Sequence, residues 1–467
     1  MMRAARLTPA VPLLALLACQ PTPPPAPLQA GEVPSAYTQS APAGAPALTQ
    51  EWWKGFGDNQ LSTLVGEAEV RNNDLAAAAA RVRQADARAR QAGAALLPTV
   101  GLNANVTSNF GVVGGSAQSE TDFSAGLAAS YELDFWGKNR DAAQSAQALA
   151  RASLADRQTV AITVTAATAN AYFNLLALRE RLAAARAGVA AGADMLGLIQ
   201  RRIDAGFAAP ADQIQEAAAL AAMQTQLPAL EQQELEARTA LAILLGRAPE
   251  GFDVPASSLD GISAPAVAAG LPSELLRRRP DIVAAEANLV SAHADLDAAR
   301  VAILPDITLS AAAGLQSPAL NAAVNTLGGT GFGGNIAAAL VQTIFDGGKI
   351  AAKTDEMKAR EEELVAQYRA AVFSALGDVE NALGNLGHAA AQERAAQNQV
   401  AQAERLLRAA QNKYRAGGAD FLVVVDAQRT LYTARDQLAQ IRLGRLSASV
   451  ALFKALGGGW SAEAAAQ

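Results

Sequence analysis

The sequence predicts a mostly helical chain with four β-strands, built from two copies of one structural unit and completed only by association with further copies. Three observations support this fold class. Punctuating residues recur at a nearly fixed offset, two helical runs far exceed the usual length of globular helices, and two pairs of segments alternate apolar with polar residues.

The internal repeat is visible in residues that begin or end the predicted elements. Asp74 and Asp281 each open a helical run, and Pro98 and Pro305 each follow the leucine that ends it, so both pairs are 207 positions apart. After the predicted strands the offset becomes 211, as in the pairs Gly137/Gly348, Gly206/Gly417 and Gly246/Gly457. Self-similarity at a fixed offset indicates duplication of one structural unit.

The N-terminus has the layout of a bacterial lipoprotein signal. Arg3 and Arg6 precede an apolar stretch at 11–18, which leads directly to Cys19, the only cysteine of the chain. The pattern predicts cleavage before Cys19 and acylation of it, and Gln20 favours sorting to the outer membrane. A plain signal peptide with an incidental cysteine is the alternative.

These features divide the chain into six segments. The stretch from 20 to 50 is rich in Pro and Ala and predicts a linker. The expected domains are a signal peptide at 1–18, a lipidated N-terminal linker at 19–57, a first repeat at 58–247, an inter-repeat linker at 248–272, a second repeat at 273–457 and a C-terminal tail at 458–467.

The predicted strands lie at about 99–135 in the first repeat and about 306–346 in the second. From 100 to 110 the even positions are mainly apolar, and from 122 to 135 the odd positions are apolar. From 307 to 315 the odd positions are again apolar, and a weaker strand follows around 335–345, where Gln342 blurs the alternation. This period of two predicts one apolar and one polar face.

Strands of about ten residues with opposite faces, joined by glycine-rich loops, are typical of outer-membrane barrels. The alternative is a half-buried soluble sheet. Because an open sheet edge is not tolerated in lipid and barrels need about eight strands or more, four strands are too few. Closure therefore requires further copies of the chain, and a trimer with four strands per copy would make twelve.

Two uninterrupted helical runs dominate the rest of the chain. Residues 138–204 and 349–414 contain no proline, which allows helices of about 65 residues and about 100 Å each. The uncharged stretch 158–178 could be read as a membrane span, but Thr159, Thr163 and Asn170 form a polar stripe, and a water-lined wall fits better. Shorter helices are expected at about 59–96, 211–245, 273–303 and 420–456.

Composition and motifs exclude several other functions. The net charge of −6, without clusters of Lys or Arg, argues against nucleic-acid binding. The two histidines, His293 and His388, have no His or Cys nearby and are expected on the solvated surface. A G-x-G-x-x-G match at 329–334 lies inside the second predicted hairpin rather than before a helix, and is read as a loop. No cofactor, metal or enzymatic activity is expected.

Three segments together carry a family resemblance: 51–58 (EWWKGFGD), 275–309 (LLRRRPDIVAAEANLVSAHADLDAARVAILPDITL) and 414–460. With them the chain resembles TolC-like outer-membrane efflux factors, in particular the lipoprotein branch, often called NodT-type, that serves resistance-nodulation-division pumps. The resemblance covers essentially everything after residue 50. It implies a homotrimer with a twelve-strand β-barrel in the outer membrane and a helical α-barrel in the periplasm, where a membrane-fusion adaptor and an inner-membrane transporter dock.

The resemblance also places a gate at the turn before the last helix. Matched residue by residue, Asp426 would form a ring of carboxylates and Leu422, one turn earlier, an apolar constriction. Arg429, three residues beyond Asp426, could offset the repulsion within that ring. Tyr414 and Asp212 match a hydrogen-bonded pair that latches the closed tip. From its spacing alone, Asp426 reads as a solvated helix position, and the resemblance is what favours the gate.

Three positions near this turn depart from the family pattern. Val423 stands where some relatives have a second constricting aspartate, and Ala419 and Ala211 stand where they have a latching Arg–Thr pair. The latch is therefore expected to be weaker here, or distributed over other residues.

The expected function is a passive exit duct of a tripartite efflux system, anchored in the outer membrane and extending into the periplasm. Two alternatives stay open at the level of sequence. One is a TolC-type exit channel for protein secretion, which shares the fold, and the other is a non-conducting, lipid-anchored periplasmic scaffold.

Overall fold

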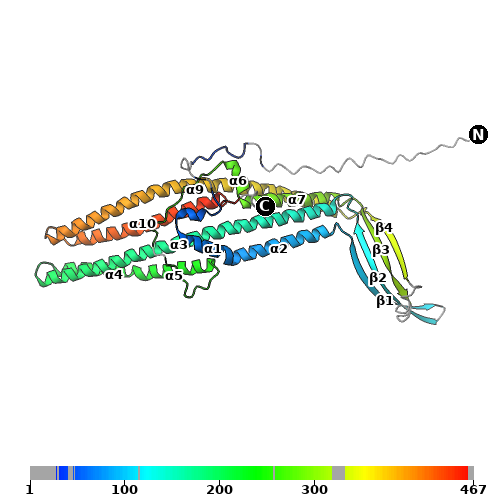
Figure 1. Cartoon of the computed structure of the whole chain (residues 1–467), viewed down its shortest axis with the longest axis horizontal. Helices are drawn as coiled ribbons and strands as arrows, with labels where there is room; N and C mark the ends of the chain where they lie inside the picture. The colour runs from blue at the N-terminus through cyan, green and yellow to red at the C-terminus, as the bar shows by residue number, and fades with distance from the viewer. Residues whose placement is uncertain are drawn as a thin grey trace, which may run out of the picture. The chain divides into compact units, whose positions relative to one another are not determined.

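The structure is a computed structural model of the chain, and it describes residues 28, 31–39, 46, 48–113, 116–255, 258–317 and 332–460. The predicted signal peptide at 1–18, Cys19 and the tail from 461 onward lie outside these residues, as do positions 114–115 and 318–331 of the two hairpins. Within the described part, helices dominate and four strands form one sheet (Figure 1).

The order of elements follows the predicted repeat of helix, hairpin, long helix, turn and helix (Figure 1). The first repeat contains η2 (Trp52–Phe56), α1 (Asn59–Arg71), α2 (Asn73–Ala94), β1 (Thr99–Val113), β2 (Ser116–Glu132), α3 (Lys138–Asp204), α4 (Pro210–Gln224) and α5 (Gln226–Leu244). The second contains α6 (Pro272–Arg278), α7 (Pro280–Val301), β3 (Asp306–Ser317), β4 (Phe332–Val341), α9 (Lys349–Arg415) and α10 (Leu422–Ala455).

Contacts divide the described chain into two compact units. One unit comprises 86–149 and 287–366 and holds the sheet with the helix segments that flank it. The other comprises the described residues of 30–85, 150–286 and 367–460, and holds the remaining helices. Each of α2, α3, α7 and α9 contributes residues to both units.

The sheet is antiparallel with strand order β1-β2-β3-β4, and its register places apolar residues on one face. Leu102 pairs with Leu127, which pairs with Ala313. Ala311 pairs with Ile336. These side chains share a face because partners in register point the same way. Val100, Leu102, Leu127 and Ile336 are all exposed, so the predicted alternation produces an apolar surface that the chain itself leaves uncovered.

Two glycines on the opposite face allow β2 and β3 to approach closely. Gly126 pairs with Gly314. A Cβ at Gly126 would lie 2.7 Å from the carbonyl oxygen of Ala313, and a Cβ at Gly314 would lie 2.5 Å from that of Ala125. Any larger residue at either position would therefore force the two strands apart.

Three helices predicted as continuous are each interrupted. The predicted run 273–303 breaks at Arg279, which is extended because the following Pro280 disfavours the helical conformation before it. The run 59–96 breaks at Asn72, which is also extended. The Asn72 side chain accepts the N–H groups of Asp74 and Leu75 and so caps α2. The run 211–245 breaks at Thr225, shortly before Pro228.

The breaks at Asn72 and Arg279 are 207 positions apart and make the same contact. Asn72 Nδ2 donates to the carbonyl of Leu244 at 2.8 Å, and Arg279 donates to that of Ala455 at 3.4 Å. In both repeats, therefore, a side chain at the helix break donates to the C-terminal end of the last helix. The last carbonyls of a helix have no partner within it, so they can accept this hydrogen bond.

Glycines complete this junction. Gly246 and Gly457 both have positive φ, 65° and 88°. A Cβ would lie 2.3 Å from the carbonyl oxygen of Arg71 at Gly246, and 1.9 Å from that of Arg278 at Gly457. Only glycine satisfies both the conformation and the close approach.

The helices α3 and α9 have 67 residues each, about 100 Å at 1.5 Å per residue. Among the described helices, α3 is the one long and apolar enough to cross a membrane by length and composition. In its apolar segment Tyr172 and Phe173 are fully buried in the chain. Tyr172 donates to Asp58 at 2.8 Å, and Phe173 packs on Phe56 with ring centroids 5.1 Å apart. This packing favours a core role for the segment.

Candidate functional site

The predicted gate residues lie around two turns, the one between α3 and α4 and the one between α9 and α10. Both long helices end in the same way. Gly206 and Gly417 each adopt a φ of 76°. The N–H of Phe207 reaches back to the carbonyl of Arg202 at 2.7 Å, and the N–H of Gly418 to that of Lys413 at 3.0 Å. These are glycine-terminated helix ends in which spare carbonyls are satisfied.

Tyr414 connects these two turns, as the sequence predicts. Its hydroxyl donates to Asp212 Oδ2 at 3.2 Å, and its ring is buried against Phe421 with centroids 5.1 Å apart. Burial, followed by the negative charge of Asp212, raises the pKa of Tyr414. The tyrosine therefore stays protonated and able to donate. The predicted pair exists in the structure, and its role as a latch stays a prediction.

Arg202 adds a second contact that sequence reasoning missed. Its guanidinium lies 4.7 Å from the centroid of the Tyr414 ring and donates to the carbonyls of Tyr414 at 3.5 Å and Phe207 at 3.3 Å. A cation over an aromatic face is stabilising. One arginine on α3 thus binds the ends of both long helices. Such a contact is one way in which the latch could be distributed over other residues, as expected from the sequence.

An apolar cluster lies beneath these polar contacts. Phe421 and Val424, at the start of α10, are buried together with residues of α3 and α9. The cluster consists of Met195, Ile199, Ala410, Tyr414, Phe421, Val424 and Ala427. It fixes the start of α10 against both long helices.

The predicted constriction residues lie on the opposite, uncovered side of α10. Leu422 is 50% exposed, and the side chain of Asp426 is 58% exposed. Arg429 approaches Asp426 with a nitrogen–oxygen distance of 3.3 Å and is itself 78% exposed. An ion pair this exposed contributes little to stability, so these side chains are available to neighbours outside the chain.

Glu216 is a titratable residue of this region that sequence reasoning missed. It lies on α4, one turn after Asp212, and is completely buried. Neither of its carboxylate oxygens has a hydrogen-bond partner among the described residues. Burial raises the pKa of Glu216 to about 7, and the neighbouring Gln428 opposes this rise only in part. Nothing in the local sequence distinguishes it from the exposed glutamates, because its burial is a tertiary effect.

The expectation of a solvated surface is wrong for His293. Its Nδ1 lies 2.7 Å from Glu361 Oε1, its Nε2 lies 3.5 Å from Asp297 Oδ2, and its side chain is only 14% exposed. The reason is the packing of α7 on α9, which the sequence does not display. His388 is exposed, as predicted. Within the described ranges, no group of three or more His, Cys, Asp or Glu residues could hold a metal ion.

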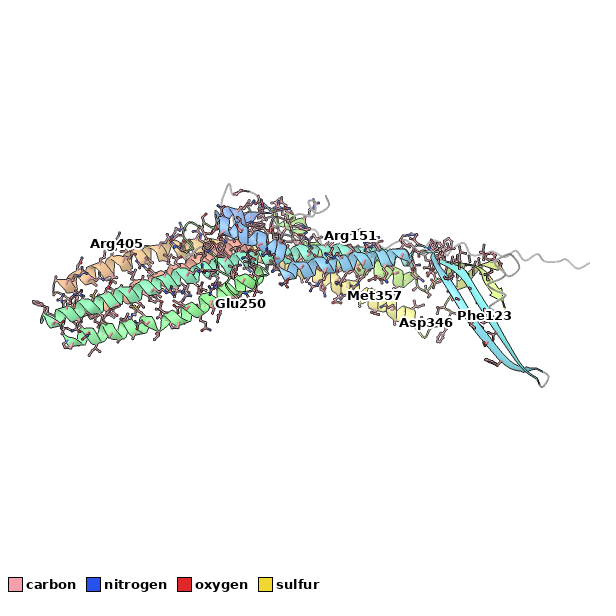
Figure 2. All side chains as sticks on the ribbon, turned by 60° about the horizontal axis from the view of Figure 1, so that its bottom comes forward. Phe123, Arg151, Glu250, Asp346, Met357 and Arg405 are labelled. Carbon is pink, nitrogen blue, oxygen red and sulfur yellow. The ribbon has the colours of Figure 1, made fainter. Side chains whose placement is uncertain are left out.

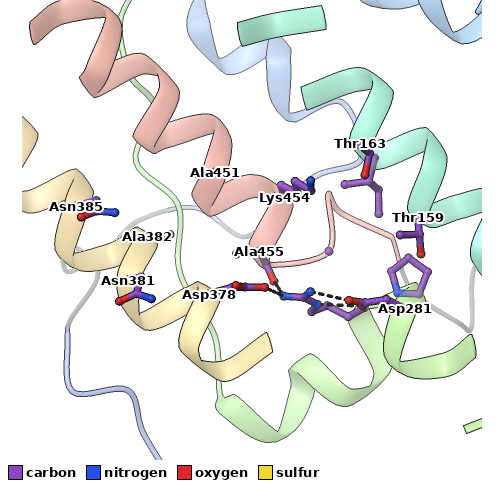
Figure 3. Close-up of a pocket in the computed structure, with 14 residues that line it drawn as sticks. Thr159, Thr163, Asp281, Asp378, Asn381, Ala382, Asn385, Ala451, Lys454 and Ala455 are labelled. Carbon is purple, nitrogen blue, oxygen red and sulfur yellow. Dashed lines mark hydrogen bonds and ion pairs between the residues drawn. The ribbon is translucent and has the colours of Figure 1, made fainter. Parts of the chain in front are cut away.

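A pocket of about 340 Å³ with mixed polar and apolar lining opens beside Arg279 (Figure 3). The guanidinium donates to Asp281 at 2.6 Å and to Asp378 at 2.9 Å, so it is fully engaged in holding α7 and α9 together. Thr159 and Thr163 of the predicted polar stripe also line this pocket.

The sheet ends in exposed aromatic residues. Phe135 follows β2 and Phe345 follows β4, and both rings are largely exposed. Asp346, labelled in Figure 2, accepts the N–H groups of Gly348 and Ile350, both at 2.8 Å, and so starts α9. An apolar band bordered by aromatic residues is the surface that strands present to lipid.

Comparison with known proteins agrees with this geometry. A model of the outer membrane efflux protein family matches residues 64–247 and 271–458. The chain is 41% identical to the pyoverdine export outer membrane protein OpmQ of Pseudomonas aeruginosa over 96% of each chain. It is 29% identical to the cation efflux system protein CusC of Escherichia coli over 88% of each chain.

Solved structures give the same result. The outer-membrane channel OprN superposes with a TM-score of 0.85 at 30% identity, covering 91% of this chain and 97% of that one. The open state of the Neisseria gonorrhoeae MtrE outer membrane channel superposes with a TM-score of 0.83 at 29% identity, covering 92% and 96%.

Proposed function

The chain belongs to the outer membrane efflux protein family, and from this premise we propose that three copies form the passive exit duct of a tripartite efflux system. In this assembly the sheets close into one barrel in the outer membrane and the helices form a tube in the periplasm. A membrane-fusion adaptor and an inner-membrane resistance-nodulation-division transporter deliver cargo to the tube and supply the energy.

The observation that carries this proposal is the open sheet. Among the described strands, β1 and β4 each pair with a single neighbour, while one face of the sheet is apolar and uncovered. Lipid offers no hydrogen-bond partner to a free strand edge, and each unpaired peptide group in hydrocarbon costs several kcal/mol, so free edges are not stable there. Closure by the edges of neighbouring copies satisfies both strands and gives the twelve strands of a barrel.

The periplasmic end is proposed to hold the gate. With three copies around one axis, Asp426 forms a ring of three carboxylates and Leu422 a ring of three apolar side chains. Arg429 partly offsets the repulsion, and the pair Tyr414–Asp212 holds the two turns together in the closed position. Opening then requires these contacts to separate when the partners dock, which makes the tip a two-state element.

Cys19 is proposed as the site of lipid attachment. The sole cysteine directly follows an apolar segment with a Leu-Leu-Ala sequence. An acyl chain there would tether the linker to the membrane in addition to the barrel. Globomycin, which blocks lipoprotein signal cleavage, should then cause accumulation of the full-length precursor, whereas a chain matured by an ordinary signal peptidase would be unaffected.

Cargo choice is proposed to reside in the transporter and the adaptor. The relatives are named for exporting pyoverdine, cations and toluene, which share no common chemistry. A duct of one architecture that serves all three needs a water-filled path rather than a selective pocket.

Conductance of the purified protein in a planar bilayer tests the proposed function. We expect discrete, cation-preferring channel events, because carboxylates line the constriction. A preparation that inserts into the bilayer but passes no ions would favour the alternative of a scaffold. Co-purification with a secretion transporter instead of an efflux transporter would favour the alternative of a protein exit channel.

A further inference from the structure

The two repeats differ in how many faces of their corresponding helices are covered. In α7, Leu289 and Ala292 are buried against Leu364 of α9. A second stripe on α7, formed by Ala284, Ser291 and Ala294, is buried as well. Helix α7 therefore packs on two sides.

Helix α2, which corresponds to α7 at the offset of 207, is covered on one side only. Its equivalents of Leu289 and Ala292 are Val82 and Ala85, and both are partly buried. Its equivalents of the second stripe are Ala77, Gln84 and Ala87, and all three are exposed. The uncovered face of α2 is thus the one that in α7 meets another helix.

The long helices show the complementary difference. In α3, Ser145, Ala148 and Ala152 share one face at intervals of three and four residues, and all are buried. Their equivalents in α9, at the offset of 211, are Glu356, Ala359 and Glu363, and all are exposed.

One contact shows what covers these faces within the chain. The hydroxyls of Ser145 on α3 and Ser291 on α7 are hydrogen-bonded at 2.9 Å and buried. Position 356 follows Ser145 by 211 residues, and position 84 precedes Ser291 by 207 residues. The counterpart of the Ser145–Ser291 contact is therefore a contact between Glu356 and Gln84.

We propose that the exposed faces of α9 and α2 form the junction between neighbouring copies, with Glu356 of one copy against Gln84 of the next. This inference rests on the proposed trimer. The sheet points to the same pair of helices. Its two edge strands are β1, which follows α2 in the chain, and β4, which precedes α9.

The chemistry of the two faces is complementary. The Gln84 amide can donate to the Glu356 carboxylate, and a hydrogen bond to a charged acceptor is stronger than one between neutral groups. Arg81 and Arg88 lie about one turn on either side of Gln84, and neither makes an ion pair with another residue of the described chain. Glu356 forms only an exposed pair with Lys353. The two arginines can face the carboxylates of Glu356 and Glu363 on α9, whereas a second α2 would bring the same two arginines against each other, so α9 is the favoured neighbour.

Alanines make close packing possible on both sides. Ala77 and Ala87 flank Gln84 on α2, and Ala359 follows Glu356 on α9. Small side chains let two helices approach along the face, as the alanines of α3 and α7 do within the chain. The junction thus repeats the internal packing with a polar pair in place of the two serines.

Cysteine cross-linking in the outer membrane of intact cells tests the inference. Cys19 is the only native cysteine, so the wild-type chain and each single variant give the background. We expect the double variant Gln84→Cys/Glu356→Cys, on oxidation, to shift from monomer to dimer and trimer bands on a non-reducing gel, and to return to monomer on reduction.

Two further pairs make the result interpretable. Ser145→Cys/Ser291→Cys should form a disulfide within one chain, since these positions already face each other at hydroxyl contact, and it shows that the packing suits a disulfide. Gln84→Cys/Lys358→Cys places the second cysteine two residues beyond Glu356, on another side of α9, and should remain monomeric.

The outcomes separate the inference from the function. Suppose that both double variants form trimers of native mass, but only Ser145→Cys/Ser291→Cys forms its disulfide. This result would overturn the proposed junction and leave the proposed duct intact. Equal cross-linking of Glu356→Cys and Lys358→Cys with Gln84→Cys would also overturn it. A chain that forms no trimer and no channel would remove the proposed function, and this inference with it.

Discussion

Asp426 bears the charge on which the proposed gate depends, and its exposure leaves that charge open to the pore. We predict that Asp426→Asn raises single-channel conductance and lowers the preference for cations, because three like charges no longer bind cations or attract restraining partners. Planar bilayer recordings measure both quantities. Arg429→Ala should act in the opposite direction on cation preference, since it removes the compensating charge 3.3 Å away. Unchanged conductance and selectivity in Asp426→Asn would rule out the gate assignment.

Tyr414 offers a way to weaken the closed tip without disturbing its packing. Tyr414→Phe removes the hydroxyl that donates to Asp212 at 3.2 Å and keeps the ring between Arg202 and Phe421. The loss of about 0.5–1.5 kcal/mol per hydrogen bond should favour the open tip, with more frequent channel opening and greater uptake of large antibiotics.

Tyr432→Phe is the matched control, because its hydroxyl donates to Gln226 at 2.6 Å further along α10. It should cost similar stability without changing opening. Equal effects of the two variants would mean that the Tyr414–Asp212 bond is an ordinary structural contact.

Glu216 predicts a dependence of stability on pH. Its pKa in the folded chain, about 7, lies above the ordinary value of 4.5, so the folded state holds the proton more tightly than the unfolded state. The stabilisation is complete below about pH 4.5 and is lost as the pH rises through 7. Glu216→Gln should therefore raise the melting temperature at pH 8 relative to wild type. It should also reduce the loss of unfolding free energy between pH 5 and pH 8 by about 1–3 kcal/mol.

Thermal unfolding at the two pH values measures this effect. Glu236→Gln, at an exposed position on α5, should keep the wild-type decline. The prediction fails if Glu216→Gln and Glu236→Gln behave alike.

At the scale of elements, the junction between the helix break and the last helix is the most constrained feature. Gly457→Ala places a methyl group 1.9 Å from the carbonyl oxygen of Arg278 at a φ of 88°, so we predict a loss of more than about 2 kcal/mol, or failure to assemble. Gly444→Ala, inside α10 with nothing within 4 Å, should instead stabilise by about 1 kcal/mol. Comparison of their melting temperatures checks the pair. Equal tolerance of both substitutions would contradict the account of this junction.

The sequence predicted where elements lie better than where they are interrupted. The break at Arg279 had a local signal in Pro280, whose effect on the preceding residue is general. The break at Asn72 had none, because it depends on the carbonyl of Leu244 and on capping by the Asn72 side chain itself. Applying the 207-residue offset to Arg279 would have located it, so the repeat carried information that local propensity did not.

The same contrast holds for the candidate site. The pair Tyr414–Asp212 was reached through family resemblance, and the structure brings the two side chains together. Arg202, Glu216 and His293 were missed or misjudged, since each acquires its role from burial between helices distant in sequence. Charged residues in alanine-rich helices look alike until packing covers some of them and leaves others exposed.

At the scale of the whole molecule, the described part of the chain is incomplete by itself: its sheet has two open edges, and one face of α2 and one face of α9 are uncovered. These features have a common explanation if identical neighbours cover them. The internal repeat makes the expectation specific, because contacts inside one chain, such as Ser145–Ser291, show the form that contacts between chains should take.

The mass of the protein extracted from the outer membrane in detergent tests this claim most directly. Light scattering with the detergent contribution subtracted should give three chains per particle, each slightly smaller than the 47.9 kDa precursor, and the particle should be a stable complex that does not dissociate on dilution. A particle that contains one chain and still conducts ions through a complete barrel would contradict the account.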